Sequence, residues 1–128
     1  VESAGRGGGF MVAEGLLPWA FGIDLATISV KAACNISVSI PKPKNIFATL
    51  QFFPSQKGVL KSIEGLNKIC DLENIVAGNL VEIGTKFSDE HNDAARLGYI
   101  LTKGKSQNES LFLADFAMQN IKYIIKPE

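Results

Sequence analysis

Apolar residues in this chain form short alternating runs and two longer runs with helical spacing, separated by turns rich in glycine and proline. The alternating runs are rich in β-branched and aromatic residues, which favour strands. The first of them is closed by two prolines, as is typical of an edge strand that runs into a turn. Strands are therefore predicted over 36–44, 45–53, 59–65, 74–84 and 97–104. Within the fourth, a glycine at position 78 predicts a bulge.

The two longer runs predict helices. The first covers 23–35, with Asp24 as N-cap and Asn35 at the end. The second follows Ser106 and Glu109, which have the spacing of a capping box, and Pro127 blocks its extension. Its apolar positions recur at helical spacing and are assigned to the core: Leu113, Phe116, Ala117, Met118, Ile121 and Ile124.

The order of these elements predicts an α+β fold, with an antiparallel sheet covered by helices. A short helix over 66–72 completes the pattern. The 128 residues suit a single domain, 1–128. Because the chain opens with Val1 and no initiating methionine, we interpret it as a fragment of a longer polypeptide.

Composition narrows the class of function. Thirteen basic and 13 acidic residues cancel, which argues against nucleic-acid binding through phosphates and against a polybasic membrane surface. Small molecules or proteins remain as partners. Charged residues, among them Glu14, Asp24 and Lys31, interrupt the longest apolar run, and no signal peptide is evident. The predicted location is the cytoplasm.

Several isolated residues allow both a structural and a functional interpretation. Cys34 and Cys70 lack metal or redox spacing and are predicted to be buried, reduced thiols. His91 stands among loop acids, where solvent exposure is favoured over a metal site. Arg96 either forms a structural salt bridge, which is favoured, or orders this loop and faces an active site.

Trp19 and Phe21 lie close to a glycine-rich segment near the start of the chain. Core packing is favoured for both side chains, and lining of a substrate pocket is the alternative.

The glycine-rich segment carries the strongest chemical signal. Successive glycines let backbone N–H groups converge on an anion, and Arg6 adds a fork suited to carboxylate or phosphate oxygens. Glu2 is a natural ligand for a magnesium ion that accompanies phosphates. Together with Gly7–Gly9, these residues suit a phosphorylated substrate, although neither the P-loop nor the dinucleotide-binding pattern fits. The alternative is a solvated, flexible terminus.

This segment resembles a known family. The pattern E-x-N-x-R-x-G-G, matched at Glu2, Arg6, Gly8 and Gly9, is similar to the end of the ATP-binding fold of ATP-grasp ligases. The following "GIDLATISVKAA", from Gly22, resembles the carboxylate–amine ligase branch that includes the bacterial L-amino acid ligases. Later segments resemble that branch's C-terminal subdomain, whose outline biotin carboxylases share: 59–69 and 92–121.

The resemblance implies a role for each matching residue. Glu2 would bind magnesium, Arg6 would hold the γ-phosphate or an acyl phosphate, and the amides of Gly7, Gly8 and Gly9 would lie near the substrate carboxylate. The implied reaction activates a carboxylate with ATP and Mg²⁺ to an acyl phosphate, which an amine or related nucleophile then attacks. Ala4 occupies the family's asparagine position, which leaves the metal stoichiometry open.

The resemblance also divides the chain. Residues 1–22 would end the ATP-grasp core, and residues 23–128 would form the C-terminal α+β subdomain. The expected partners are a missing N-terminal ATP-binding half of the same chain, small-molecule carboxylate and amine substrates, and a second copy in a homodimer. The fragment alone is expected to be inactive. The alternative is a non-catalytic binding or assembly module, which would bury the apolar segment 10–21 that a ligase fragment leaves exposed.

Overall fold

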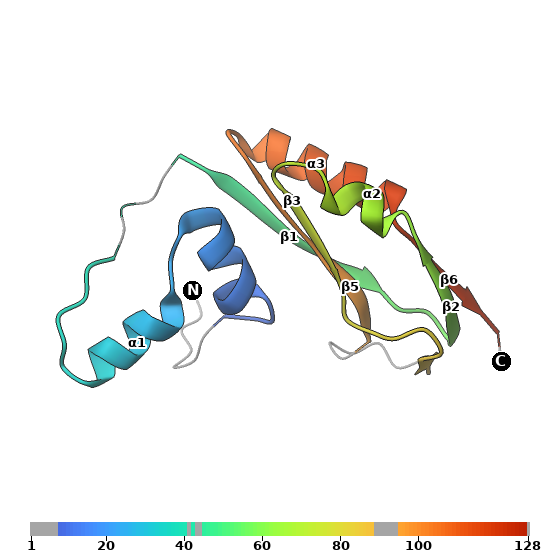
Figure 1. The fold of residues 1–128 in the computed structure, drawn as a ribbon, viewed down its shortest axis with the longest axis horizontal. Coiled ribbons are helices and arrows are strands. Elements are labelled where there is room, and N and C mark those ends of the chain that lie inside the picture. The colour runs from blue at the N-terminus through green and yellow to red at the C-terminus, as the bar shows by residue number, and fades with distance from the viewer. Residues whose placement is uncertain (1–7, 41, 43–44, 89–94, 128) are drawn as a thin grey trace.

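The protein is described by a computed structural model that covers residues 8–40, 42, 45–88 and 95–127 (Figure 1). Its elements follow in this order: η1 (Val12–Phe21), α1 (Leu25–Ala33), β1 (Phe47–Pro54), β2 (Gly58–Glu64), α2 (Leu66–Cys70), β3 (Ile75–Asn79), β4 (Lys86–Phe87), β5 (Arg96–Gly104), α3 (Gln107–Asn120) and β6 (Lys122–Lys126). The predicted α+β class, with antiparallel strands and covering helices, is confirmed.

Two antiparallel sheets organise the molecule. Sheet A has the order β1-β5-β3, and sheet B has the order β4-β2-β6. In Figure 1, α2 and α3 lie on one side of sheet A and η1 lies on the other, with α1 farther from the strands. Sheet A is therefore the central layer, and its two faces meet different elements.

The face of sheet A beneath α2 and α3 forms the core. Phe53 of β1 and Ile100 of β5 are buried there against Ala117 of α3. Three hydroxyls fasten the helix to the sheet: those of Thr49 and Ser110 hydrogen-bond at 2.6 Å, and Thr102 Oγ1 donates to the Ser110 carbonyl oxygen at 2.7 Å. Because Thr102 and Ser110 are buried, these bonds fix where α3 sits.

The predicted strands over 45–53, 59–65 and 97–104 are confirmed as β1, β2 and β5. The predicted edge strand over 36–44 is wrong where the structure describes it, since 36–40 pair with no other strand. The fourth predicted strand is shorter than expected and ends at Asn79. Gly78 forms no bulge there; the Tyr99 ring lies where its side chain would be, so only glycine fits opposite Tyr99.

The last helix begins as predicted and ends early. The Ser106 side chain accepts from the Glu109 N–H at 3.1 Å, as an N-cap does. The helix stops at Asn120, and Ile124, assigned to its core stripe, instead lies in β6 and pairs with β2. The tertiary pairing with β2 overrides helical spacing in a segment rich in isoleucine and tyrosine.

Both cysteines are free thiols, but the prediction that they are buried is wrong. Cys34 caps the C-terminus of α1, a helix without any buried residue. Cys70 ends α2, and its Sγ lies 3.5 Å from the Ala77 carbonyl oxygen. The exposure of both thiols follows from their positions at helix ends.

Helix α1 forms as its sequence predicts. Asp24 Oδ1 accepts from the Thr27 N–H at 2.9 Å, and Asn35 ends the helix in the left-handed conformation, with φ of 55°. No single helix in the described residues is long and apolar enough to cross a membrane; η1 and α1, bent by 109°, meet that length and composition only as a pair.

Candidate functional site

The predicted site lies partly outside the described residues. Glu2, Arg6 and Gly7 belong to the undescribed segment 1–7, and His91 belongs to 89–94. Gly8 and Gly9 are described and exposed. A Cβ added at Gly9 would meet no atom within 4 Å, so the backbone at Gly9 is open on that side.

The glycine segment enters η1 through a tight turn. The Val12 N–H donates to the Gly9 carbonyl oxygen at 3.1 Å, and Met11 takes a left-handed conformation with φ of 63°. The Met11 N–H donates to Glu14 Oε1 at 2.6 Å. These bonds hold the end of the glycine segment against the first turn of the helix.

Helix η1 is a wide helix in which Leu16 N–H donates to Met11 O, five residues earlier, at 2.8 Å. Such helices are rare and occur often at functional sites. Gly15 is buried where η1 meets the sheet: a Cβ there would lie in ordinary contact with Leu101 Cδ1 of β5, at 3.4 Å, and would displace the end of the Met11 side chain, at 2.7 Å. Lys103 Nζ lies 4.5 Å from the Trp19 ring centroid, so Trp19 is half-buried against β5 rather than in the core.

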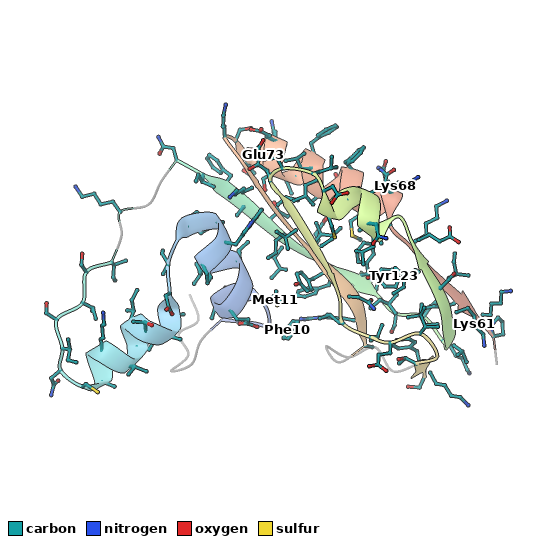
Figure 2. All side chains as sticks on the ribbon, in the orientation of Figure 1. Phe10, Met11, Lys61, Lys68, Glu73 and Tyr123 are labelled. Carbon is teal, nitrogen blue, oxygen red and sulfur yellow. The ribbon has the colours of Figure 1, made fainter. Side chains whose placement is uncertain are left out.

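An aromatic pair joins the glycine segment to sheet A. Phe10, directly after Gly9, lies with its ring centroid 6.1 Å from that of Phe52 on β1. The guanidinium carbon of Arg96 lies 3.9 Å from the centroid of the Phe52 ring. Figure 2 shows Phe10 and Met11 where η1 meets the sheet. The sequence allowed either a structural salt bridge or a role near an active site for Arg96. The structure places its guanidinium over the Phe52 ring of this pair.

A bulge in β5 explains how Arg96 reaches this face. Phe53 pairs with Gly98 and Pro54 pairs with Arg96, so Leu97 is an extra residue in the ladder. With regular alternation, Arg96 would share the face of Gly98 and point into the core beneath α3. The bulge instead places Leu97 in the core and Arg96 over Phe52, on the face of η1.

The described residues contain no cluster of three or more acids, histidines or cysteines that could hold a metal ion. Glu14, the acid nearest the glycine segment in sequence, accepts the Met11 N–H. The predicted magnesium ligand, Glu2, lies outside the described residues.

Among the described residues, the pKa values of Asp24, at the start of α1, and Tyr123, in β6, are shifted. Hydrogen bonds from the Thr27 side chain and backbone N–H lower the pKa of Asp24 below its usual 3.8. Burial raises the pKa of Tyr123 from 10.0 to about 12, and its hydroxyl has no hydrogen-bond partner among the described residues. Neither group contacts the aromatic pair, so both report on folding rather than on the site.

Comparison with known proteins identifies the family of this chain. The family described as L-amino acid ligase C-terminal domain 2 matches residues 51–126, which is more than half of the chain. This chain belongs to the L-amino acid ligase C-terminal domain 2 family. The expected relation to the C-terminal portion of an ATP-grasp ligase is confirmed.

Solved structures share the fold. The L-amino acid ligase from Bacillus licheniformis superimposes with a TM-score of 0.71 over 87% of this chain and 28% of its own, at 17% identity. Phosphoribosylglycinamide synthetase from Anaerococcus prevotii superimposes with a TM-score of 0.67 over 91% of this chain and 30% of its own, at 20% identity. The chain thus spans less than a third of either protein. A search of curated proteins finds no match.

The family match covers only part of the candidate site. Phe52 and Arg96 lie within the matched residues, whereas Gly8, Gly9 and Phe10 precede them. The glycine segment stands out by composition, whereas Phe52 was predicted only as part of the strand over 45–53. Gly98, next to Leu97, is a glycine inside a strand and was the one local signal for the bulge that brings Arg96 to Phe52.

Proposed function

We propose that this chain is the C-terminal part of an ATP-dependent ligase that joins a carboxylate to an amine or related nucleophile in the cytoplasm. The observation that carries the proposal is the family match over residues 51–126. The shared fold with the Bacillus licheniformis L-amino acid ligase supports it. The carboxylate would be activated as an acyl phosphate at the expense of ATP, with Mg²⁺ as metal.

The glycine segment would bind the anionic part of the reactants. Arg6 offers a planar fork to phosphate or carboxylate oxygens, and the amides of Gly7–Gly9 offer further donors without side chains in the way. Gly9 supports this role, because its backbone is exposed and open on one side. Glu2 would hold the magnesium ion, which offsets charge on the phosphates when bound.

The rest of the ligase would cover the N-terminal elements. Within the apolar segment 10–21, Gly15 and Ala20 are buried, while Phe10 is 49% exposed and most other side chains are half-buried. No residue of α1 is buried, and Val30 on it is 64% exposed. These surfaces suit an ATP-binding half that the fragment alone lacks, so the 128 residues alone would be inactive.

The test compares the full-length protein with an Arg6 variant. Purified protein is mixed with ATP, Mg²⁺ and panels of carboxylates and amines, and ADP release and product mass are measured. We expect ADP release that depends on both substrates, with Arg6→Met losing about 10²-fold or more of it, a loss of the size that follows removal of one charge-stabilising donor. The matched control is Lys42→Met, which replaces an exposed cation outside the site with the same residue, methionine. It should leave the rate of ADP release unchanged.

Two results would overturn the proposal. One is ADP release that is absent with every substrate pair. The other is ADP release that Arg6→Met leaves at the level of the unsubstituted protein. Absence of turnover together with tight binding of a macromolecule would favour the binding or assembly module instead.

A further inference from the structure

The bulge at Leu97 gives Arg96 a neighbour that alternation along β5 would not give it. Even-numbered residues of β5, such as Gly98 and Thr102, face α3 or the core, and odd-numbered residues, such as Leu101 and Lys103, face η1. Arg96 breaks this rule, since it lies over Phe52 on the side of η1. Bulges of this kind re-aim one side chain and occur often beside active sites.

The partner of Arg96 is itself in contact with the glycine segment. Phe52 is half-buried on β1, and its ring contacts two partners: the Arg96 guanidinium carbon lies 3.9 Å from its centroid, and the Phe10 ring centroid lies 6.1 Å from it. A guanidinium over an aromatic ring and a pair of tilted rings are both attractive arrangements. The order Arg96–Phe52–Phe10 therefore links the start of β5 to the residue after Gly9.

We propose that the bulge at Leu97 is a positioning device for the glycine segment. It turns Arg96 onto Phe52, and the stacked pair holds Phe10 and the turn at Met11 against sheet A. Phe52 and Arg96 are thus positioning residues: they act on the candidate anion site through Phe10. This positioning role concerns how the glycine segment is held and adds to the proposed ligase function. Only the kinetic test below depends on the ligase function being correct.

Strand β1 supplies a matched control. Phe47 and Phe52 are aromatic residues of the same strand, five positions apart, and therefore lie on opposite faces. Phe47 is 46% exposed, and the ring pairs found among the described residues, Phe10–Phe52 and Phe53–Tyr123, do not include it. Replacing Phe47 removes a similar apolar area from β1 without touching the stack.

The first test measures hydrogen exchange in the full-length protein. The Met11 and Val12 amides are hydrogen-bonded, so their exchange rates report how firmly the turn is held. Phe52→Leu should speed their exchange about three- to tenfold, since it removes both ring contacts. Phe52→Tyr should restore the rate, because the ring remains, and Phe47→Leu should leave it unchanged.

A second variant guards against misfolding of Phe52→Leu. Arg96→Met lies at the start of β5, keeps an unbranched apolar stem and removes the guanidinium group with its charge. It should speed exchange of the same amides in the same direction, with the overall unfolding temperature within about 3 °C of the parent. Exchange at Met11 and Val12 that neither variant alters, or that Phe47→Leu alters as much, would overturn the proposal.

The kinetic test separates positioning from chemistry. In the active ligase, Phe52→Leu and Arg96→Met should raise KM for the carboxylate about tenfold while kcat stays within about twofold, because a displaced site loses binding. Phe52→Tyr should restore KM. Equal loss of activity in Phe47→Leu would overturn the positioning role. If the protein shows no ligase activity at all, the proposed function fails, while the exchange experiment still decides whether the stack holds the glycine segment.

Discussion

The two ends of this molecule are built differently. Residues 47–127 form two sheets under α2 and α3, with buried residues on most strands and on both helices. Residues 8–40 form η1, which rests on sheet A, and α1, which has no buried residue. The family match covers the first region, and the predicted chemistry lies in or ahead of the second.

The difference teaches where stability and function reside. The sheets and α3 supply a framework stabilised by a buried apolar core and by hydrogen bonds among Thr49, Thr102 and Ser110. The glycine segment meets that framework through η1 and the stack of Arg96, Phe52 and Phe10. Substitutions in the framework should therefore change global stability, whereas substitutions in the N-terminal region should act locally. The predictions below test this contrast.

The largest effect is expected at Gly65, between β2 and α2. Its φ is +83°, and an added Cβ would overlap the carbonyl oxygen of Asn120 at the end of α3. Gly65→Ala should lower the free energy of unfolding by about 3 kcal/mol or more, through strain and displacement of α3. The control is Gly84→Ala, where φ is also positive but no atom lies within 4 Å, so about 1 kcal/mol is expected. Urea denaturation of both variants measures the two losses of unfolding free energy. Equal losses would contradict the close approach of Gly65 to the Asn120 carbonyl oxygen.

The hydroxyls beneath α3 come next. Thr102→Val removes a buried hydroxyl that donates to the Ser110 carbonyl oxygen, which should cost about 2 kcal/mol. Thr49→Val removes one bond at a half-buried position and should cost about 1 kcal/mol. Thermal unfolding of the two variants provides the measurement. A loss no greater at Thr102 than at Thr49 would show that burial does not set the strength of this attachment.

The pH dependence of the framework should report Tyr123. Its pKa is raised to about 12 from 10.0, so the folded state favours the neutral phenol. The stability due to this preference is fully present below pH 10 and is lost as the pH rises through about 12. Tyr123→Phe should remove this loss and, since the hydroxyl is unpartnered, stabilise the protein by about 1 kcal/mol at pH 7. Denaturation at pH 7, 10 and 11.5 tests both parts, with Tyr99→Phe as the comparison; a pH profile unchanged by Tyr123→Phe would refute the assignment.

The smallest global effect is expected at Asp24. Its lowered pKa means that the cap on α1 is present above pH 3.8 and is lost as the pH falls below that value. Asp24→Ala should speed hydrogen exchange within α1 and leave the unfolding transition of the sheets unchanged, because α1 has no buried residue. Asp24→Asn keeps an acceptor and should retain the cap at every pH. A shift of the whole transition in Asp24→Ala would contradict the separation of the two regions.

Local signals predicted much of the fold. The alternation around β1 and the N-caps at Asp24 and Ser106 are local, and all three are confirmed. The predicted capping box is only half formed, because Glu109 Oε2 accepts from the Lys105 N–H at 2.7 Å. The pairing of β6 with β2 depends on residues some sixty positions apart, such as Ile63 and Tyr123, which no local pattern reveals. That pairing ended α3 earlier than its apolar spacing predicts.

The site was predictable only in part, for the same reason. The glycine segment and Arg6 stand out by composition alone. The contact of Phe10 with Phe52, and the bulge that carries Arg96 to the ring, join residues distant in sequence. The bulge predicted at Gly78 was wrong because a glycine inside a strand can mark either a bulge or a close contact. Here it marks a close contact with the Tyr99 ring.

The central claim, that this chain is part of an ATP-dependent carboxylate–amine ligase, is tested most directly by substrate-dependent ADP release from the full-length protein. Carboxylates labelled with ¹⁸O identify the route, because acyl phosphate formation transfers one labelled carboxylate oxygen to the released phosphate. The account predicts ADP release that requires both carboxylate and amine, with ¹⁸O in the phosphate. ADP release without ¹⁸O in the phosphate, or none with any substrate pair, would contradict it.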